Sequence, residues 1–594
     1  MQVNVYAVKL GQGQHLEFHV SLAMQAVLSW WSSNKAVEIY MEANRQKCSL
    51  GQALQRCELL RQQYVKLGAE CIRNWERCEG ANCEFQLNLM QYESFIANFA
   101  GRFLLTEEIK SLVAKQYTSL QGQWLYAVQW GVLDGKLTFM NGMVNIPRNK
   151  HWKFWQREQI QCVRCGNETK QHARTWCSNC GESCSYCEAC ITMGKVRYCS
   201  LIVHGRAHIL YPNRSLIWSK VREVAPAELS LERWNLSQAQ TEAVRQAIKF
   251  VQGECALSRE FLLWAVTGAG KTEMIYPLVQ TVAASGGRVC IASPRKDVIL
   301  ELLPRLKVAF PEIKIQALYG GCEERWEQAE LILATTHQLI RYRTFFDLVI
   351  LDEIDAFPYY GDQQLAYIVN QACREEGKFV LLSATPPQIL RKLANKGKLP
   401  HALVCVRYHG YPLPVPEKLR MKSIRRWSKQ GQVMHLPPKL TSAINRSLHR
   451  GAQIFIFVPL IAQVKQVVDA MRQTYQGIQI AGISSRDPER THKVLQFRQI
   501  ELRIIVTTTI LERGVTVPKS DVFVLEADSP LFQSSTLIQM AGRAGRRADD
   551  PYGFVTFCST EWTSSQREAI RDIRRMNKLA HQQGYLRVGS GGSR

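Results

Sequence analysis

The sequence of 594 residues lacks any apolar run near the 18 or so residues needed to cross a bilayer. Its first six residues offer neither the basic nor the apolar stretch of a secretory signal. Acidic residues are in deficit, because 51 Asp and Glu stand against 75 Lys and Arg. The formal net charge of +24 favours a polyanionic partner, the alternative being a basic charge that serves solubility alone. We therefore expect a cytoplasmic protein without a transmembrane segment.

Cysteine is plentiful but unevenly distributed. Eight of the 19 cysteines lie between Cys162 and Cys199, and they include two Cys-x-x-Cys pairs, each followed by glycine. In a reducing compartment such pairs favour a metal over disulfides. Eleven residues separate Cys162/Cys165 from Cys177/Cys180, and two such pairs can close a tetrahedral Zn²⁺ site. The other four cysteines are candidate ligands of a second zinc site, which can interleave with the first: Cys184, Cys187, Cys190 and Cys199.

A glycine-rich segment, Ala-Val-Thr-Gly-Ala-Gly-Lys-Thr at residues 265–272, directly follows an apolar run. It predicts a strand, a tight turn and a helix whose N-terminus accepts a polyphosphate. Lys271 would reach the outer phosphates and Thr272 would hold Mg²⁺, whereas the alternative is a turn without a ligand. Upstream, the Gln240 amide would pair with adenine and so select ATP. The predicted nucleotide-binding residues are Gln240, Ala265, Gly268, Ala269, Gly270, Lys271 and Thr272.

An acidic motif, Asp-Glu-Ile-Asp at residues 352–355, ends a second apolar run. A carboxylate at the C-terminal end of a parallel strand lies beside the phosphate loop. Asp352 is then placed to hold Mg²⁺ and Glu353 to polarise the attacking water, the alternative being an acidic turn. Residues 383–385, Ser-Ala-Thr, follow a further apolar run, and their hydroxyls are expected to bridge to the acidic motif.

Far downstream, residues 539–547 read Gln-Met-Ala-Gly-Arg-Ala-Gly-Arg-Arg. Arg543 and Arg546 are three residues apart and would lie on one face of a helical turn. Arginines from a second lobe can neutralise a transferring phosphoryl group, which is worth roughly 10³–10⁵ in rate. The alternative is a solvated basic helix. The predicted catalytic residues are therefore Lys271, Asp352, Glu353, Arg543 and Arg546.

Short apolar runs alternate with helical stretches from about residue 235 to 400 and again from about 450 to 560, which predicts an α/β fold with parallel sheets. In their order and spacing, the motifs resemble superfamily 2 helicases and translocases, which have two tandem RecA-like lobes. The chain more closely resembles the late competence protein ComFA family. This resemblance is carried by residues 292–298, 352–358 and 507–516, and by a cysteine-rich finger placed before the motor.

The resemblance implies an ATPase driven by single-stranded DNA that helps draw transforming DNA into a competent bacterium. It also implies a ComFC-type, phosphoribosyltransferase-like partner, while the motifs above predict ATP, Mg²⁺ and Zn²⁺ as cofactors. A DNA-uptake channel at the inner membrane is a further candidate partner, with the chain then peripheral at the inner face of the membrane. By motif position, the candidate contacts to DNA phosphates are Ser293, Arg295, Thr335, Thr336, Thr508 and Thr509.

We accordingly divide the chain into five parts, listed here in order. They are an α-rich N-terminal accessory region (1–150), a Cys-rich zinc-binding module (151–210), RecA-like lobe 1 (211–405), RecA-like lobe 2 (406–588) and a flexible tail (589–594). Two segments that interleave basic and aromatic residues, 148–157 and 418–450, are candidate single-strand surfaces, or else solvated charged faces. Two other functions stay open: a replication-restart helicase resembling PriA, whose cysteine cluster follows the phosphate loop, and an inactive nucleic-acid adaptor.

Overall fold

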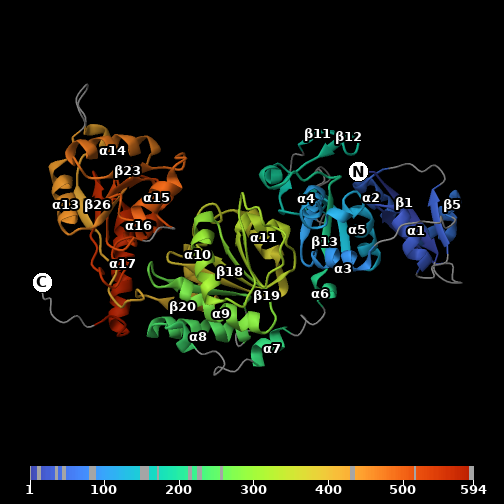
Figure 1. Ribbon diagram of the computed structural model, residues 1–594, viewed down its shortest axis with the longest axis horizontal. Helices are drawn as coiled ribbons and strands as arrows, with labels where there is room; N and C mark the ends of the chain where they lie inside the picture. Colours follow the sequence, from blue (N-terminus) through green and yellow to red (C-terminus); the bar gives the residue numbers. More distant parts are fainter. Residues whose placement is uncertain are drawn as a thin grey trace.

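The computed structural model describes residues 2–9, 15–33, 38–42, 48–78, 88–146, 160–169, 173–211, 217–223, 231–253, 258–427, 435–513 and 517–587. Along the long axis of the molecule, an N-terminal region is followed by a central α/β lobe and then by a second α/β lobe at the opposite end (Figure 1). The functional residues predicted from the sequence lie in the two lobes and in the cysteine-rich module.

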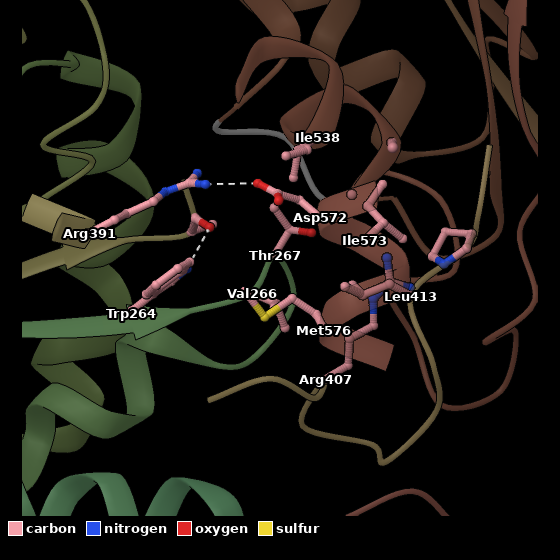
Figure 2. A pocket seen from close by; sticks show the side chains of 14 residues that line it. Trp264, Val266, Thr267, Arg391, Arg407, Leu413, Ile538, Asp572, Ile573 and Met576 are labelled. Carbon is pink, nitrogen blue, oxygen red and sulfur yellow. Dashed lines mark hydrogen bonds and ion pairs between the residues drawn. The ribbon is translucent and has the colours of Figure 1, made fainter. Parts of the chain in front are cut away.

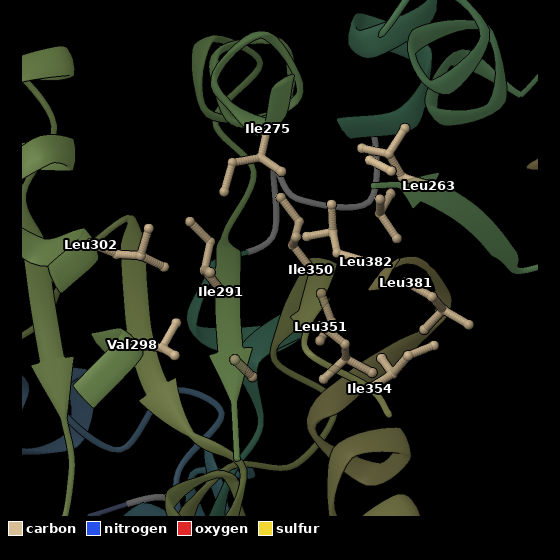
Figure 3. Packing of buried hydrophobic residues seen from close by; sticks show 14 of the residues in the cluster. Leu263, Ile275, Ile291, Val298, Leu302, Ile350, Leu351, Ile354, Leu381 and Leu382 are labelled. Atoms are coloured by element: carbon tan, nitrogen blue, oxygen red, sulfur yellow. The ribbon is translucent and has the colours of Figure 1, made fainter. Parts of the chain in front are cut away.

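The first lobe is a seven-stranded sheet in the order β16-β17-β15-β18-β19-β14-β20, and every pairing in it is parallel. Its strands are β14 (Glu260–Ala265), β15 (Val289–Ser293), β16 (Ile315–Leu318), β17 (Leu331–Thr335), β18 (Phe346–Asp352), β19 (Cys373–Ser383) and β20 (His401–Val404). Its helices include α8 (Gln238–Gln252), α9 (Lys271–Ala284), α10 (Lys296–Ala309), α11 (Gln363–Ala372) and α12 (Gln388–Asn395). Side chains of α9 and α10 pack toward the strands, as Ile275 and Leu302 do beside Ile291 (Figure 3).

The second lobe repeats this architecture with six parallel strands in the order β21-β26-β25-β22-β24-β23. The strands are β21 (Glu417–Arg420), β22 (Gln453–Phe457), β23 (Ile480–Ile483), β24 (Ile504–Thr507), β25 (Ser520–Leu525) and β26 (Val555–Ser559). The helices are α13 (Pro438–His449), α14 (Ile461–Thr474), α15 (Arg490–Arg498), α16 (Ser534–Ala541) and α17 (Ser564–Gln582). The prediction of two parallel sheets is confirmed. Sheets covered by helices on both faces read as continuous apolar runs, which is why the sequence revealed them.

The N-terminal region, predicted to be α-rich, contains the helices α1 (Met24–Ser33), α2 (Leu50–Leu67), α3 (Leu89–Ala97), α4 (Thr106–Gln116) and α5 (Trp124–Leu133). It also contains an antiparallel sheet that the sequence analysis did not predict, formed by β1 (Gln2–Lys9), β2 (Leu16–Ser21), β3 (Glu38–Glu42), β4 (Cys48–Ser49) and β5 (Trp75–Arg77). From Leu16 to Val20 of β2, every second side chain is buried. The strand therefore carries only three apolar residues, Leu16, Phe18 and Val20, which is too short a pattern to predict a strand from sequence.

The cysteine-rich segment is an insertion rather than a consecutive domain. Strand β13 (Leu201–Gly205) follows the cysteines, yet it lies between β6 (Phe103–Leu105) and β7 (Leu137–Asn141), which precede them. The predicted boundary at residue 150 thus separates β13 from the two strands with which it pairs, and the other domain bounds stay a prediction. Within the insertion lie β9 (Ile160–Cys162), β10 (Glu168–Thr169), β11 (Arg174–Cys177), β12 (Glu182–Ser185) and a 3-10 helix, η3 (Glu188–Met193); β8 (Met143–Asn145) pairs with β9.

Candidate functional site

The phosphate loop has the predicted form, with β14 ending at Ala265 and α9 beginning at Lys271. Gly268 and Gly270 have φ angles of 79° and 74°, in the left-handed region that favours glycine. The Gln240 side chain braces the loop, because its Nε2 donates to the Ala269 carbonyl at 2.8 Å. Its Oε1 accepts from the Ser237 N–H at 2.7 Å, so both ends of the amide contact protein. The adenine contact of Gln240 stays a prediction, beside this structural role.

A cavity of about 350 Å³ opens above the loop and is lined by both lobes. All five predicted catalytic residues line it: Lys271, Asp352 and Glu353 from the first lobe, and Arg543 and Arg546 from the second. Gln240, Gly268, Gly270 and Thr272 line it as well, whereas Ala265, at the end of β14, and Ala269, within the loop, are buried. The cavity therefore gathers the sequence-predicted residues of two sheets around one space.

The acidic motif begins at the C-terminal end of β18, as predicted from the apolar run that precedes it. Desolvation raises the pKa of Asp352 to about 6, although the nearby Lys271 acts to lower it. The backbone of Glu353 is in the left-handed region, with φ 57°, and its N–H donates to Asp352 Oδ1 at 2.9 Å. Asp352 and Thr272 offer oxygen ligands to one space, which suits Mg²⁺ completed by waters and phosphate oxygens. When bound, this ion would neutralise phosphate charge.

Asp355 connects the acidic motif to the rest of the site. Ser383 Oγ and Thr385 Oγ1 each donate to its carboxylate at 2.6 Å, which confirms the predicted bridge. Burial acts to raise the pKa of Asp355, but Arg513 and these hydroxyls hold it at about 2. Gln539 Nε2 of the second lobe donates to Thr385 Oγ1 at 3.3 Å. Asp355 thus links three motifs across the two lobes.

Arg513 is the functional residue that sequence reasoning missed. Its side chain is nearly fully buried and lies 2.5 Å from Asp355, 3.7 Å from Glu353 and 3.4 Å from Glu512. The signal was available, since Arg513 belongs to the stretch 507–516 that carried the family resemblance. Arg305 and Tyr408 also line the cavity without having been predicted.

The two predicted arginine fingers are held by carbonyl groups of their own lobe. Arg543, which is 2 % exposed, donates through Nε and Nη2 to the Glu512 carbonyl at 2.9 and 2.7 Å. Arg546 Nε donates to the Gly542 carbonyl at 2.9 Å. Burial lowers the pKa of both guanidinium groups, and Arg546 further lowers the pKa of Arg543. Two cations crowded beside a phosphate loop form a site that an anionic ligand would stabilise.

The lobes also contact one another behind the phosphate loop (Figure 2). Arg391 of α12 lies 2.8 Å from Asp572 of α17, and Trp264 Nε1 donates to the Ala384 carbonyl within the first lobe. Arg407, in the segment between the lobes, is 1 % exposed and donates to the Gly545 carbonyl. Burial lowers the pKa of Arg407 to about 9. The loop that carries Arg543 and Arg546 is thus hydrogen-bonded, through the Gly545 carbonyl, to the segment that joins the two lobes.

The eight clustered cysteines form two groups of four thiols, and within each group all sulfur atoms lie within 4.8 Å of one another. The groups are Cys162/Cys165/Cys187/Cys190 and Cys177/Cys180/Cys184/Cys199. The two sets interleave, which is the alternative that the sequence left open. Cys162/Cys165 do not share a group with Cys177/Cys180, because the β11–β12 hairpin gathers its own ligands and returns the chain to the first pair. Four thiols without a carboxylate suit a closed, structural Zn²⁺ site, so both groups fit the predicted metal.

Three segments of the chain match models of known protein families. Residues 91–204 match the model of the competence protein ComFA N-terminal domain, residues 237–393 the DEAD/DEAH box helicase model, and residues 437–548 the helicase conserved C-terminal domain. Competence protein ComFA of Bacillus subtilis (strain 168) is 36% identical over 457 residues, covering 76% of this chain and 91% of that protein. The chain belongs to the ComFA family.

A second ComFA, from Streptococcus pneumoniae (strain ATCC BAA-255 / R6), is 40% identical over 319 residues, covering 54% of this chain and 73% of that protein. The helicase RecG of the same species (strain ATCC BAA-334 / TIGR4) is 23% identical over 386 residues, covering 60% and 53%. This ComFA family member is therefore a helicase-like enzyme of superfamily 2 that hydrolyses ATP and belongs to the competence system. No helix in the described part of the chain is both long and apolar enough to span a membrane.

The predicted phosphate contacts of this ComFA-family chain lie at the C-terminal ends of strands, but most of them are enclosed. Four of the side chains are buried beneath the strand ends: Ser293, Thr335, Thr336 and Thr508. Arg295 Nη2 donates to the Ile510 carbonyl of the second lobe at 2.6 Å, and Thr509 is exposed. Contact of these side chains with DNA phosphates stays a prediction, and for the four buried residues it requires the surrounding packing to open.

The basic segment 418–450 serves the packing of the second lobe in part. Trp427 is a core residue, Arg450 pairs with Asp521, and the Lys418 ammonium lies 3.9 Å from the centre of the Trp562 ring. The segment 148–157 lies outside the described residues, as does the tail 589–594. These contacts fit the alternative of a charged face with core aromatic residues, and the strand-binding role of 418–450 stays a prediction.

Proposed function

We propose that this ComFA-family ATPase translocates along single-stranded DNA and that ATP hydrolysis thereby powers the uptake of transforming DNA. The observation that carries the proposal is the cavity that Lys271, Asp352 and Glu353 share with Arg543 and Arg546. A nucleotide bound there touches both lobes at once. Its terminal phosphate balances cations that otherwise face one another, so losing that phosphate weakens the attraction between the lobes.

A change in the fit between lobes moves anything that the lobes hold. Arg295 of the first lobe donates to Ile510, in the same loop as Thr508 and Thr509 of the second. Opening the cavity would separate these residues and would expose oxygens that are covered when the lobes are closed. The net charge of +24 supports a polyanionic track. Repeated closure and opening is then a mechanism for stepping along a phosphate backbone.

The test is ATP hydrolysis at one ionic strength with no nucleic acid, single-stranded DNA, duplex DNA or single-stranded RNA. We expect single-stranded DNA to give the strongest stimulation, and Lys271→Ala to abolish turnover under all conditions. Equal rates with and without single-stranded DNA would contradict the proposal. The ionic strength must be fixed because phosphate contacts weaken steeply with salt.

The proposed partners follow from membership of the ComFA family. They are single-stranded DNA, a ComFC-type phosphoribosyltransferase-like protein and a DNA-uptake channel at the inner membrane. The enzyme would then act in the cytoplasm, peripheral to the inner face of the membrane. Co-purification of the full chain with a ComFC-type protein from the same organism tests the protein partner, and recovery of either protein alone would argue against it.

A further inference from the structure

A second cavity, of about 880 Å³, separates the first cysteine group from the first lobe. One wall is the turn that follows Cys165, and the other is the segment that leads from the acidic motif into α11. Gly166 seats the turn on α11, because a Cβ atom there would lie 2.6 Å from the Tyr367 ring. We call this cavity the module cleft.

Two aromatic side chains of the module cleft are exposed. Phe357 is 87 % exposed and Tyr360 is 56 % exposed, and both line the cleft. Tyr359, between them, instead packs against the core of the first lobe. A large ring left in water forfeits the burial that stabilises the other aromatic residues. Because Tyr359 anchors the segment to the first lobe, the exposed rings of Phe357 and Tyr360 are available to stack on a flat ligand.

The polar groups of the cleft suit bases better than phosphates. Gln161, Asn167 and Gln363 contribute amides, which can both donate to and accept from the edge of a base. The charged residues that line the cleft are Glu168 and Asp362. Among the described residues of its lining none is Lys or Arg, so a phosphate placed inside would meet carboxylates without a cation.

We propose that the module cleft binds unstacked bases of single-stranded DNA, with Phe357 and Tyr360 as stacking platforms. This inference rests on the proposed function and names the place where that function engages the bases. The backbone would pass outside the cleft, over the ends of the strands of the first lobe. Base stacking of this kind is tolerant of sequence because every base has a flat face.

The cleft adjoins elements that lead to two of the predicted DNA contacts. The 3-10 helix η6 (Thr336–Arg341) follows β17 and lies beside α11, where Thr344 N–H donates to the Gln371 carbonyl just after η6. At the other end of α11, Asp362 caps the helix by accepting from the Gln364 and Leu365 N–H groups. The charge of the Asp362 carboxylate also acts to raise the pKa of His337, which burial lowers overall. His337 directly follows the predicted phosphate-contacting pair Thr335 and Thr336.

The cleft is also connected to the ATPase site through the backbone. Phe357 lies two residues after Asp355, which binds Arg513 of the second lobe. The intervening Ala356 N–H donates to the Glu353 carbonyl at 2.9 Å. A base that displaces Phe357 would therefore pull on the segment that holds the acidic motif. Binding of a base in the cleft could thus shift the acidic motif through only a few residues of backbone.

The experiment compares a thymidine oligonucleotide with an abasic oligonucleotide of the same length, using the full chain. Affinity is measured by fluorescence anisotropy, and ATP turnover is measured with each strand. We expect wild type to bind the thymidine strand more tightly by about fivefold or more for each stacked base. In the double variant Phe357→Ala/Tyr360→Ala this ratio falls towards one, while Phe357→Tyr and Tyr360→Phe retain it. Tyr552→Ala, which removes an exposed ring of the second lobe, is the matched control and keeps the wild-type ratio.

The outcomes separate this inference from the proposed function. If wild type is stimulated equally by the thymidine and abasic strands, the cleft does not bind bases, although the translocase proposal stands. If no single strand stimulates wild type, the translocase proposal itself fails. The cleft proposal is overturned if the double variant keeps the wild-type ratio of affinities, or if its affinity falls by the same factor for both strands. Unchanged DNA binding with loss of a protein partner would reassign the cleft to protein docking and would also overturn it.

Discussion

Arg513 of the second lobe lies 2.5 Å from Asp355 of the first, and both side chains are almost completely buried. The same Asp355 accepts hydrogen bonds from Ser383 and Thr385, and Thr385 accepts one from Gln539. The pair therefore stands at the centre of a polar network that crosses the lobe interface. Separating the lobes would break the contacts that cross their interface, so we expect this network to respond to how closely the lobes approach.

Replacing Arg513 by alanine should uncouple the lobes while leaving the phosphate loop intact. We expect ATP turnover with single-stranded DNA to fall by about 10²-fold, since misplacement of catalytic groups by about 1 Å has that effect. The buried Asp355 carboxylate would lose its partner, which typically costs about 3–5 kcal/mol of folding free energy and lowers the Tm. Arg391→Ala, which breaks the interlobe pair with Asp572 outside the nucleotide cavity, is the control. Equal losses of turnover in the two variants would argue against a special role for Arg513.

Arg546→Ala should retain nucleotide binding but lower turnover by about 10³-fold, within the range known for arginine fingers. The neighbouring Arg547 is exposed and pairs with Asp549, so Arg547→Ala is a charge-matched control that we expect to turn over ATP normally. Binding is measured with a fluorescent ATP analogue and turnover by phosphate release. Normal turnover in Arg546→Ala would show that this guanidinium does not act on the transferring group.

The affinity of the enzyme for Mg²⁺ should depend on pH through Asp352. Its folded pKa of about 6 lies above the ordinary value of 3.8, because burial disfavours the charged form. Mg²⁺ needs the carboxylate, so its apparent affinity should fall about tenfold for each pH unit below 6. Without the ion, the stabilising contribution of this group is full below about pH 4 and is lost as the pH rises through 6.

Magnesium titrations of nucleotide binding across this pH range test the assignment. Asp352→Asn should weaken the Mg²⁺ dependence at high pH and should remove the proton-linked slope. A slope that persists unchanged in Asp352→Asn would assign the titrating proton to the nucleotide or to another group.

The zinc groups make a prediction that separates the observed ligand pairing from the one favoured by sequence spacing. Cys162→Ser/Cys187→Ser alters one group only, so we expect it to lose one of two bound zinc ions. Cys162→Ser/Cys177→Ser alters both groups, so it should lose both ions. Elemental analysis of the purified proteins measures the outcome. The sequential pairing reverses the two results, with the first double variant losing both ions and the second losing one.

The parts of the fold that the sequence predicted are those in which a local pattern determines the structure. The strands β15, β17 and β18 are continuous apolar runs that end at polar residues, and their order places those residues at one edge of a parallel sheet. The phosphate loop and the two arginines were predictable for the same reason. Each is a short motif whose spacing fixes its geometry, and the cavity confirms that they converge.

The parts that escaped prediction depend on contacts between distant segments. Strand β13 returns to pair with β6 and β7 across the whole cysteine-rich insertion, and nothing within its five residues announces that partner. The thiols of Cys187 and Cys190 join Cys162 and Cys165 only because the β11–β12 hairpin intervenes. Arg513 lies in the stretch 507–516 that carries the family resemblance, but its pairing with Asp355 depends on the approach of the other lobe, which that stretch alone does not specify.

The central claim is that closing and opening of the lobes around ATP moves the enzyme along a single strand. Its most direct test is the time at which the enzyme reaches a fluorophore at one end of single-stranded oligonucleotides of increasing length, with strands labelled at either end. We predict an ATP-dependent lag that grows in proportion to length for one of the two labelled ends and disappears in Lys271→Ala. Arrival times that do not depend on length at either end would contradict translocation, even if single-stranded DNA stimulates hydrolysis.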